Sequence, residues 1–297
     1  MIDNLTLELT TACNFRCVHC FQERDNVFMD TAMAISLIDR ADSLGVNQVV
    51  LTGGEPTLHP EFASIYRKAR DLGFIMNVFT NAAHFNDSTW NLFTATPPHV
   101  ASVTLYGFAQ GVFTSVTGSR LPSSRVLQNV LRLKSLGIDV YLKFHAMTLT
   151  VNEVSDFVEF AKQNGCDSSV NIQIIPPLSG LRDTVQYRLN ASEVQEIEER
   201  FGFNFTPSLD QDTSQCTLGD DLYVSVNGMI QGCPIFAGGA GRLTLESIEG
   251  QLDILRNSGS EIRRQRTLNR GVCPAWLHLE GVENVRKYLQ SLGAESV

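Results

Sequence analysis

Strand-like and helix-like segments alternate along the first two thirds of this chain of 297 residues, and this alternation constrains its fold more than any other feature. Apolar, β-branched runs predict strands, and amphipathic stretches between them predict helices, several of which end at a glycine. The predicted strands cover residues 5–10, 47–52, 74–79, 101–105, 139–144 and 170–175. The predicted helices include residues 31–44, 60–72, 124–136, 152–164 and 191–201.

Successive strands start about one strand-helix unit apart, which indicates a parallel sheet with right-handed crossovers. We therefore expect an α/β fold, a partial (β/α)6 barrel of parallel strands with helices outside. Near residue 210 the pattern changes, and residues 222–231 predict a β-hairpin turning at Asn227-Gly228. The prediction has two domains, a barrel over residues 1–205 and a small α+β extension over 206–297, with helices near 245–256 and 281–292.

Charge and cysteine content narrow the classes of function. The net charge of -9 argues against attraction to a nucleic-acid backbone. No apolar stretch reaches the roughly 18 residues of a membrane span, and the N-terminus lacks the pattern of a signal peptide, so we expect a cytoplasmic protein without membrane or nucleic-acid partners. In that reducing compartment, seven cysteines favour metal ligands or buried thiols over disulfides.

Three of the cysteines, Cys13, Cys17 and Cys20, lie within eight residues directly after the first predicted strand. Three thiolates on one loop can hold three irons of a cubane cluster and leave the fourth open. An open iron can bind a small molecule through an amine and a carboxylate and pass it an electron. A zinc site or an inert cluster are the alternatives, although structural zinc prefers four protein ligands.

The second predicted strand ends in Thr52-Gly53-Gly54-Glu55-Pro56. Two glycines allow a backbone to approach a ligand closely, with its N–H and C=O groups exposed. In a barrel this loop lies on the same rim as the cysteines, because both follow the carboxyl ends of neighbouring strands. The pair predicts one site for a metal cluster and for the amino and carboxylate groups of a ligand.

Together, the Cys-x3-Cys-x2-Cys pattern and the Gly-Gly-Glu-Pro loop resemble the radical S-adenosylmethionine (SAM) superfamily over roughly residues 4–180. The resemblance implies a 4Fe-4S cluster on the three cysteines, SAM as co-substrate, and an electron donor such as flavodoxin or ferredoxin. It also implies SAM contacts, with Gly53, Gly54 and Glu55 at the methionyl group and the backbone of His19 near the adenine. Further SAM contacts are expected from Thr80, Asn81, Thr104 and Lys143, and Lys143 could instead be a paired structural lysine.

Glu8 lies on the first strand, just before the cysteines. It is predicted to point into the barrel, where a carboxylate could transfer protons as a catalytic residue. A carboxylate satisfied by hydrogen bonds within the barrel is the alternative.

Three further cysteines, Cys216, Cys233 and Cys273, fall in the predicted extension. Cys216-x2-Gly219, the hairpin and Cys233-Pro234 resemble the SPASM/twitch extension, which implies a second, auxiliary 4Fe-4S cluster. The set departs from that pattern because a fourth cysteine is missing, so the last iron would be open, bound to substrate or held by another residue such as His278. A zinc site or buried thiols are the alternatives.

The resemblance implies reductive cleavage of SAM to a 5'-deoxyadenosyl radical, which abstracts hydrogen from a peptide or small-molecule substrate. An auxiliary cluster that accepts an electron favours crosslinking or oxidation of a ribosomally made peptide. Dehydrogenation of a sugar-derived alcohol, peptide epimerisation and a non-catalytic iron-sulfur regulator are the alternatives. Epimerisation needs a thiol that returns hydrogen, and Cys166, which precedes the sixth strand, is predicted to lie at the opposite rim.

Overall fold

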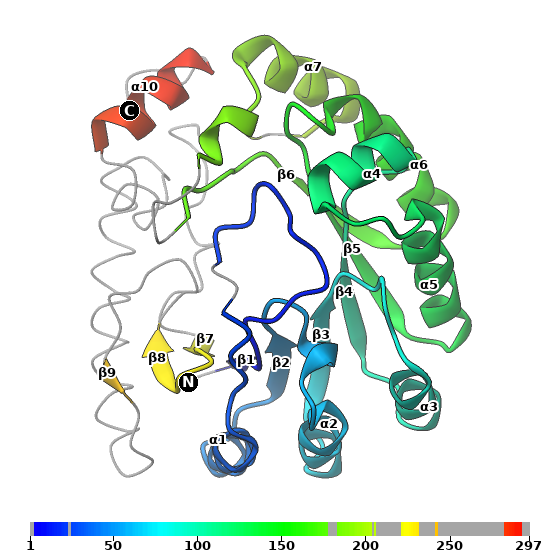
Figure 1. Cartoon of the computed structure of the whole chain (residues 1–297), viewed down its shortest axis with the longest axis vertical. Helices are drawn as coiled ribbons and strands as arrows, with labels where there is room; N and C mark the ends of the chain where they lie inside the picture. The colour runs from blue at the N-terminus through cyan, green and yellow to red at the C-terminus, as the bar shows by residue number, and fades with distance from the viewer. Residues whose placement is uncertain are drawn as a thin grey trace.

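The computed structural model describes residues 3–22, 25–177, 183–203, 205, 221–231, 241–242 and 282–292. Six parallel strands follow one another in a curved sheet whose two edges do not meet, so the predicted partial barrel is confirmed (Figure 1). Their pairing order is the order of the sequence. These strands are β1 (Asn4–Glu8), β2 (Gln48–Thr52), β3 (Ile75–Thr80), β4 (Val100–Leu105), β5 (Asp139–His145) and β6 (Asp167–Asn171).

Helices cover the outer face of this sheet (Figure 1). The predicted helices that fall within the described residues are present, with shifts of one or two residues at several ends, and the 3-10 turn Val151–Glu153 replaces the start of the fourth. The helix predicted near residues 245–256 lies outside the described residues. Asp30 caps the first helix by accepting a hydrogen bond from the N–H of Met33 at 2.9 Å. The described helices are α1 (Thr31–Ser43), α2 (Phe62–Asp71), α3 (Asp87–Ala95), α4 (Gln110–Thr117), α5 (Ser123–Ser135), α6 (Val154–Gln163), α7 (Ala191–Phe201) and α10 (Val282–Ser291).

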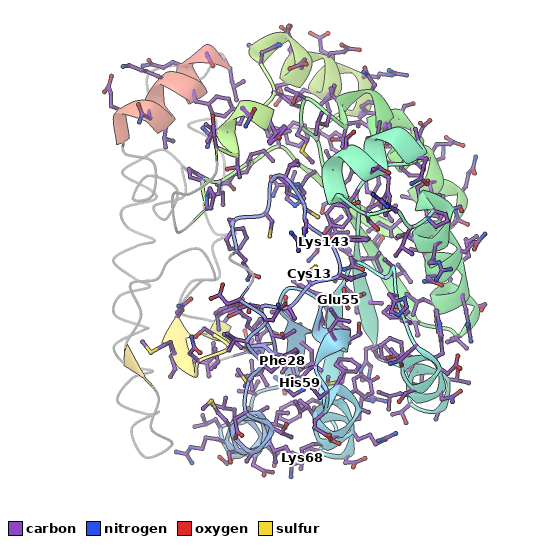
Figure 2. The ribbon with its side chains drawn as sticks, in the orientation of Figure 1. Cys13, Phe28, Glu55, His59, Lys68 and Lys143 are labelled. Carbon is purple, nitrogen blue, oxygen red and sulfur yellow. The ribbon has the colours of Figure 1, made fainter. Side chains whose placement is uncertain are left out.

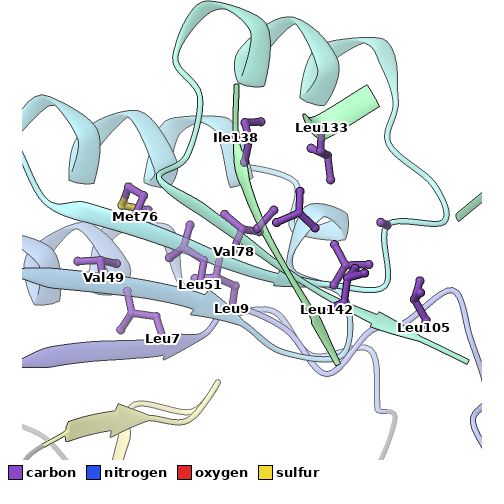
Figure 3. Packing of buried hydrophobic residues seen from close by; sticks show 14 of the residues in the cluster. Leu7, Leu9, Val49, Leu51, Met76, Val78, Leu105, Leu133, Ile138 and Leu142 are labelled. Atoms are coloured by element: carbon purple, nitrogen blue, oxygen red, sulfur yellow. The ribbon is translucent and has the colours of Figure 1, made fainter. Parts of the chain in front are cut away.

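The core lies between the sheet and these helices (Figure 3). Alternate strand residues face it, such as Leu7 on β1, Leu51 on β2 and Leu142 on β5, and each is fully buried. Burying one such side chain contributes about 1.5–3 kcal/mol. The residues between them face the inner side of the sheet, so each strand contributes every second side chain there.

The sixth strand begins three residues earlier than predicted and ends at Asn171. Its first residues are Asp-Ser-Ser, which carry no apolar signal, and they pair with β5 from Tyr141 onward. The strand stops because the side-chain oxygen of Asn171 accepts a hydrogen bond from the N–H of Gln173 at 2.6 Å, which turns the chain. The predicted strand at residues 170–175 was therefore misplaced.

The predicted hairpin is confirmed as β7 (Asp221–Val224) and β8 (Met229–Gln231), with Gly228 in the turn at φ +76°. Its place in the fold was not predicted: β7 pairs in parallel with β1 and extends the main sheet, and β9 (Gly241–Arg242) follows β8. The division of the chain at residue 205 stays a prediction. Of the described helices, none is long and apolar enough to cross a membrane.

Candidate functional site

The carboxyl ends of the parallel strands gather the predicted site residues at one rim of the sheet. Figure 2 shows Cys13, Glu55 and Lys143 close to one another in the middle of the curved sheet, although they come from three different elements. Two loops form this part of the rim. We call residues 10–20 the cysteine loop and residues 52–56 the glycine loop.

The cysteine loop is bound to the glycine loop along its backbone. The N–H of Gly54 donates to the carbonyl of Thr10 at 2.7 Å, and the N–H of Glu55 donates to the carbonyl of Ala12 at 2.8 Å. On its other side, the N–H of Thr11 donates to the carbonyl of Val27 at 3.0 Å. These backbone bonds fix the start of the cysteine loop before any ligand is present.

The two glycines are required by this contact. A Cβ at Gly53 would lie 2.3 Å from the carbonyl oxygen of Thr10, and a Cβ at Gly54 would lie 2.4 Å from that of Ala12. The φ of +149° at Gly53 is also one that side chains with a Cβ rarely adopt. The cysteine loop thus occupies the space that the glycines leave open, whereas their contact with a methionyl group stays a prediction.

Within the cysteine loop, Cys17 is buried, and Cys13 and Cys20 are half-buried. The N–H of Cys20 donates to the carbonyl of Cys17 at 3.2 Å, and the N–H of Phe15 approaches the Sγ of Cys13 at 3.4 Å. Phe15 anchors the loop, since its buried ring packs edge-on against Phe113 with centroids 5.4 Å apart. The three thiols are therefore presented from one well-packed loop.

Glu55 is almost fully buried and accepts several hydrogen bonds. Its Oε1 accepts from the hydroxyls of Thr57 at 2.7 Å and Thr80 at 2.8 Å, and its Oε2 accepts from the N–H of Asn81 at 2.8 Å. Burial raises the pKa of Glu55, and these hydrogen bonds oppose that rise. The predicted residues Glu55, Thr80 and Asn81 thus form one network.

Asn81 connects this network to the cysteines. Its Nδ2 donates to the side-chain oxygen of Asn14 at 2.7 Å and lies 3.8 Å from the Sγ of Cys13. Its Oδ1 accepts from the N–H of Ala83 at 2.9 Å, which fixes the orientation of the amide. The end of β3 therefore holds the first cysteine in place, a role that the sequence did not reveal.

Glu8 is buried at the end of β1, on the inner face of the sheet. Its carboxylate accepts hydrogen bonds from the Nε2 of Gln22 and from the N–H of Val226, both at 2.9 Å, and also from the side chain of Tyr223. Burial raises the pKa of Glu8, and these hydrogen bonds oppose the rise. The arrangement matches the alternative of a carboxylate satisfied inside the barrel, and a role in proton transfer stays a prediction.

The β4 and β5 side of the rim carries Thr104 and Lys143, which are paired residues on neighbouring strands. The Nζ of Lys143 lies 3.3 Å from the centroid of the Phe79 ring. Burial lowers its pKa to about 8. Within the described part of the chain, Lys143 forms no ion pair, and its contact with the SAM carboxylate stays a prediction.

His19 from the cysteine loop stacks at a tilt on His145, the last residue of β5, with ring centroids 4.8 Å apart. Burial, followed by the charge of Lys143, lowers the pKa of His145 to about 4, so its ring is neutral at physiological pH. The Nδ1 of His145 is buried and has no hydrogen-bond partner within the described residues. His145 was missed in the sequence, although its spacing of two from Lys143 places both on one face of the strand.

Tyr106 was also missed. It directly follows β4 and its ring contacts those of Phe15 and His19. Other site residues were not predicted from the sequence either. They are Asn14, Gln22 and the hairpin residues that hydrogen-bond to Glu8. The only signal for Tyr106 and Asn14 was their position in rim loops.

The remaining predicted ligands cannot be placed: Cys216, Cys233 and Cys273, like His278, lie outside the described residues. Cys166 is half-buried and directly precedes β6, so it lies at the rim opposite the cysteine loop, as predicted.

A parallel, open barrel with three cysteines and a Gly-Gly-Glu loop on its functional rim defines a class of α/β proteins built to hold a metal cluster at the carboxyl ends of their strands. The family model described as the radical SAM superfamily matches residues 7–172, and the chain belongs to that superfamily. Membership implies a 4Fe-4S cluster and SAM. The residues present fit the cluster, since three thiols share one loop and the Phe15 and Asn81 donors approach the Sγ of Cys13.

The similar proteins include relatives in sequence and neighbours in structure. A probable GTP 3',8-cyclase from Saccharolobus islandicus (strain M.14.25 / Kamchatka #1) is 26% identical, covering 91% of this chain and 92% of its own length. SuiB from Streptococcus suis, solved with S-adenosylmethionine, has a TM-score of 0.67 at 17% identity, covering 88% of this chain and 68% of its own. The protein anSMEcpe, solved with AdoMet and a peptide, has a TM-score of 0.64 at 14% identity, covering 88% of this chain and 82% of its own length. The two structures show that the fold is shared.

Proposed function

We propose that Cys13, Cys17 and Cys20 hold a 4Fe-4S cluster with one open iron and that the chain is a SAM-cleaving enzyme. When bound, the cluster supplies the electron that cleaves SAM to methionine and a 5'-deoxyadenosyl radical, which abstracts hydrogen from the substrate. The observation that carries the proposal is the backbone contact between the cysteine loop and Gly54-Glu55. It places the thiols beside the loop that we expect to receive the methionyl group.

The surrounding residues bind and orient SAM in this proposal. Gly53, Gly54 and Glu55 lie against the methionyl group, and Thr80 and Asn81 hold the Glu55 carboxylate through hydrogen bonds. Holding these groups in place beforehand lowers the entropy lost on binding. The backbone of His19 meets the adenine, and Thr104 contacts SAM from β4.

Lys143 is proposed to meet the SAM carboxylate. It is a buried cation with no ion pair among the described residues, and a carboxylate would form a charge-assisted hydrogen bond with it. The proton-transfer role of Glu8 is the least supported part of the proposal, because its carboxylate already accepts hydrogen bonds from Gln22 and Val226.

For the substrate we propose a ribosomally made peptide that is crosslinked or oxidised. The predicted auxiliary 4Fe-4S cluster on Cys216, Cys233 and Cys273 supports this, because it could accept the second electron of an oxidation. Epimerisation ranks lower since Cys166 lies at the opposite rim. Flavodoxin or ferredoxin would supply electrons, and seven cysteines suit the reducing cytoplasm.

A second candidate substrate is a nucleoside triphosphate. The relatives named probable GTP 3',8-cyclase align along 91% of this chain and favour it. A triphosphate needs several cations, however, and within strands β1 to β6 Lys143 is the single lysine or arginine. This charge balance favours a substrate with less negative charge.

Anaerobic reconstitution with iron and sulfide, followed by reduction in the presence of SAM, tests the proposal. Formation of 5'-deoxyadenosine is expected. Its absence would overturn the hypothesis that the chain is an enzyme and favour a non-catalytic iron-sulfur regulator. About eight irons per chain would support two clusters and about four would leave only the first. Incubation with GTP and, separately, with short peptides encoded by neighbouring genes distinguishes the two substrates by which one is converted to a product with a new chromatographic retention time or a new mass.

A further inference from the structure

The turn that follows β3, at residues 80–83, contains a residue in an unfavourable backbone conformation. Ala82 has a φ of +51°. A residue with a Cβ adopts this left-handed conformation at a cost in free energy, because the Cβ comes close to the following carbonyl oxygen. Alanine also lacks the short polar side chain with which asparagine or aspartate can offset that cost. Contacts with other residues must therefore hold the turn in this form.

Hydrogen bonds hold this turn both from within and from a distant helix. Within the turn, the N–H of Ala82 donates to the Oγ1 of Thr80 at 3.0 Å, and the N–H of Ala83 donates to the Oδ1 of Asn81 at 2.9 Å. From α5, the Nδ2 of Asn129 donates to the carbonyl of Ala82 at 2.7 Å. Ala82 is fully buried, and buried carbonyls are normally paired. Asn129 thus bonds directly to the strained residue.

Ala82 directly follows Asn81, whose amide reaches the cysteine loop. The Nδ2 of Asn81 donates to the Oδ1 of Asn14 at 2.7 Å and lies 3.8 Å from the Sγ of Cys13. The Oδ1 of the same amide accepts from the N–H of Ala83, so its orientation depends on where the backbone places Ala83. The φ of Ala82 sets that position. If Ala82 relaxed to a negative φ, the N–H of Ala83 would move away and release the Asn81 amide.

We propose that Asn129 is a positioning residue for the cysteine loop. Its hydrogen bond keeps Ala82 in the left-handed conformation, and this conformation directs the Asn81 amide toward the loop. The consequence for the reaction rests on the proposed cluster at Cys13, Cys17 and Cys20. The contacts themselves lie within the chain, so the effect of Asn129 can be measured both with and without iron.

The test compares Asn129→Ala with Asn164→Ala in the full chain. Asn164 also donates from its Nδ2 to a backbone carbonyl, that of Phe160 at 2.8 Å, but it caps the end of α6, at the rim opposite the cysteine loop. Hydrogen–deuterium exchange of the iron-free protein, followed by mass spectrometry, measures the opening of residues 80–85 and of the cysteine loop. We expect both segments to exchange about five- to tenfold faster in Asn129→Ala, the effect of losing one buried hydrogen bond, and at the wild-type rate in Asn164→Ala.

Two further variants make this test specific. Glycine adopts a positive φ without the cost, so adding Ala82→Gly to Asn129→Ala is expected to return both exchange rates to within about twofold of the wild type. Asn129→Asp keeps the shape of the side chain but donates no hydrogen bond when ionised. It is expected to exchange like Asn129→Ala and covers the case in which the alanine variant fails to fold. After anaerobic reconstitution, iron content should fall in Asn129→Ala and recover in the double variant.

Wild-type exchange in Asn129→Ala would overturn the inference. Faster exchange confined to residues 80–85, or with no loss of iron, would also overturn it, because Asn129 would then serve only the turn. Faster exchange that Ala82→Gly fails to reverse would show that the strain at Ala82 is not the link. A wild-type chain that forms no 5'-deoxyadenosine would overturn the proposed function instead, and exchange in the iron-free chain would still decide whether Asn129 positions the loop.

Discussion

The two sides of the rim differ in how fully their polar groups are satisfied. At the ends of β2 and β3, the Glu55 carboxylate accepts from Thr57, Thr80 and Asn81. At the end of β5, Lys143 forms no ion pair within the described residues and the Nδ1 of His145 is buried without a hydrogen-bond partner there.

Buried polar groups are normally paired, so each side suggests a different purpose. The β2 and β3 side holds the cysteine loop in place through interactions that the chain makes with itself. On the β5 side, no described residue pairs with the Lys143 cation or with the Nδ1 of His145, which is consistent with the SAM contact that we propose for Lys143. Substitutions on the β2 and β3 side are therefore expected to destabilise the cysteine loop, whereas substitutions on the β5 side are expected to weaken ligand binding.

Cys17→Ala is expected to have the largest effect, because it removes one of the three proposed cluster ligands from the cysteine loop. After anaerobic reconstitution, the variant should lack the electron paramagnetic resonance (EPR) signal that changes when SAM is added. It should also form no detectable 5'-deoxyadenosine. Cys166→Ala, at the opposite rim, is the control and should match the wild type. Wild-type activity in Cys17→Ala would remove the cysteine loop from the proposed chemistry.

Gly54→Ala is expected to have the next largest effect, since the new Cβ would lie 2.4 Å from the carbonyl oxygen of Ala12. The backbone fixes the positions of both atoms, and neither can rotate away, so the two loops must separate. We expect a loss of about 2–4 kcal/mol in unfolding free energy and a reduced iron content. Gly111→Ala in α4 meets no atom within 4 Å and should be neutral or slightly stabilising.

Thermal unfolding and iron analysis of both glycine variants measure this prediction. If Gly54→Ala incorporates iron and unfolds like Gly111→Ala, the backbone contact between the loops does not hold the cluster site together.

Much of the β2 and β3 side could be predicted from the sequence, because the sequence signals for it are local. Strand periodicity, helix-ending glycines and the two rim motifs each lie within a few residues, and parallel strands bring their ends together in any such fold. Even so, the reason for Gly53 and Gly54 was not foreseen. Which chain packs against a glycine is decided by tertiary structure.

The other features depended on contacts between distant residues. Val226 donates to Glu8 across 218 positions of sequence, and it can do so because β7 pairs with β1, an arrangement that strand periodicity alone does not specify. Tyr106 is one aromatic residue among many until the rim loops are assembled. The polar start of β6 at Asp167 hid that strand because pairing with β5, rather than apolar burial, defines it.

Lys143→Met tests the β5 side, where no described residue pairs with the cation. Removing a buried cation should stabilise the protein at pH 7 by about 1–3 kcal/mol while weakening SAM binding roughly 10- to 100-fold, the worth of one charge-assisted hydrogen bond. Burial lowers the pKa of Lys143 to about 8, whereas a lysine in the unfolded chain has a pKa of about 10.4. Between these values the unfolded state binds more protons, so wild-type stability rises with pH, and the methionine variant should lose that rise.

Melting temperatures at pH 7 and pH 9.5, together with SAM binding by equilibrium dialysis, measure both parts of this prediction. Lys162→Met, an exposed lysine on α6, controls for the loss of one charge. Unchanged SAM affinity in Lys143→Met would assign the cation to the substrate instead.

Glu8→Gln is expected to have the smallest effect. It tests whether Glu8 only holds the structure together, like Glu55, or also takes part in the reaction. Burial raises the pKa of Glu8 above the unfolded value, so the folded state holds this proton more tightly. As pH rises from 5 to 7, the wild type should therefore lose stability relative to Glu8→Gln, by on the order of 1 kcal/mol. Exposed Glu159→Gln on α6 serves as the control, and melting temperatures at both pH values measure the difference.

The activity of Glu8→Gln separates anchoring from catalysis. If Glu8 only holds the hairpin through Val226, product formation should stay within a few-fold of the wild type, because the glutamine oxygen can still accept that N–H. If Glu8 transfers a proton, 5'-deoxyadenosine should still form while product falls by about 100-fold or more. A relative stability that rises with pH would contradict both expectations, since it would require a positive partner that keeps Glu8 ionised.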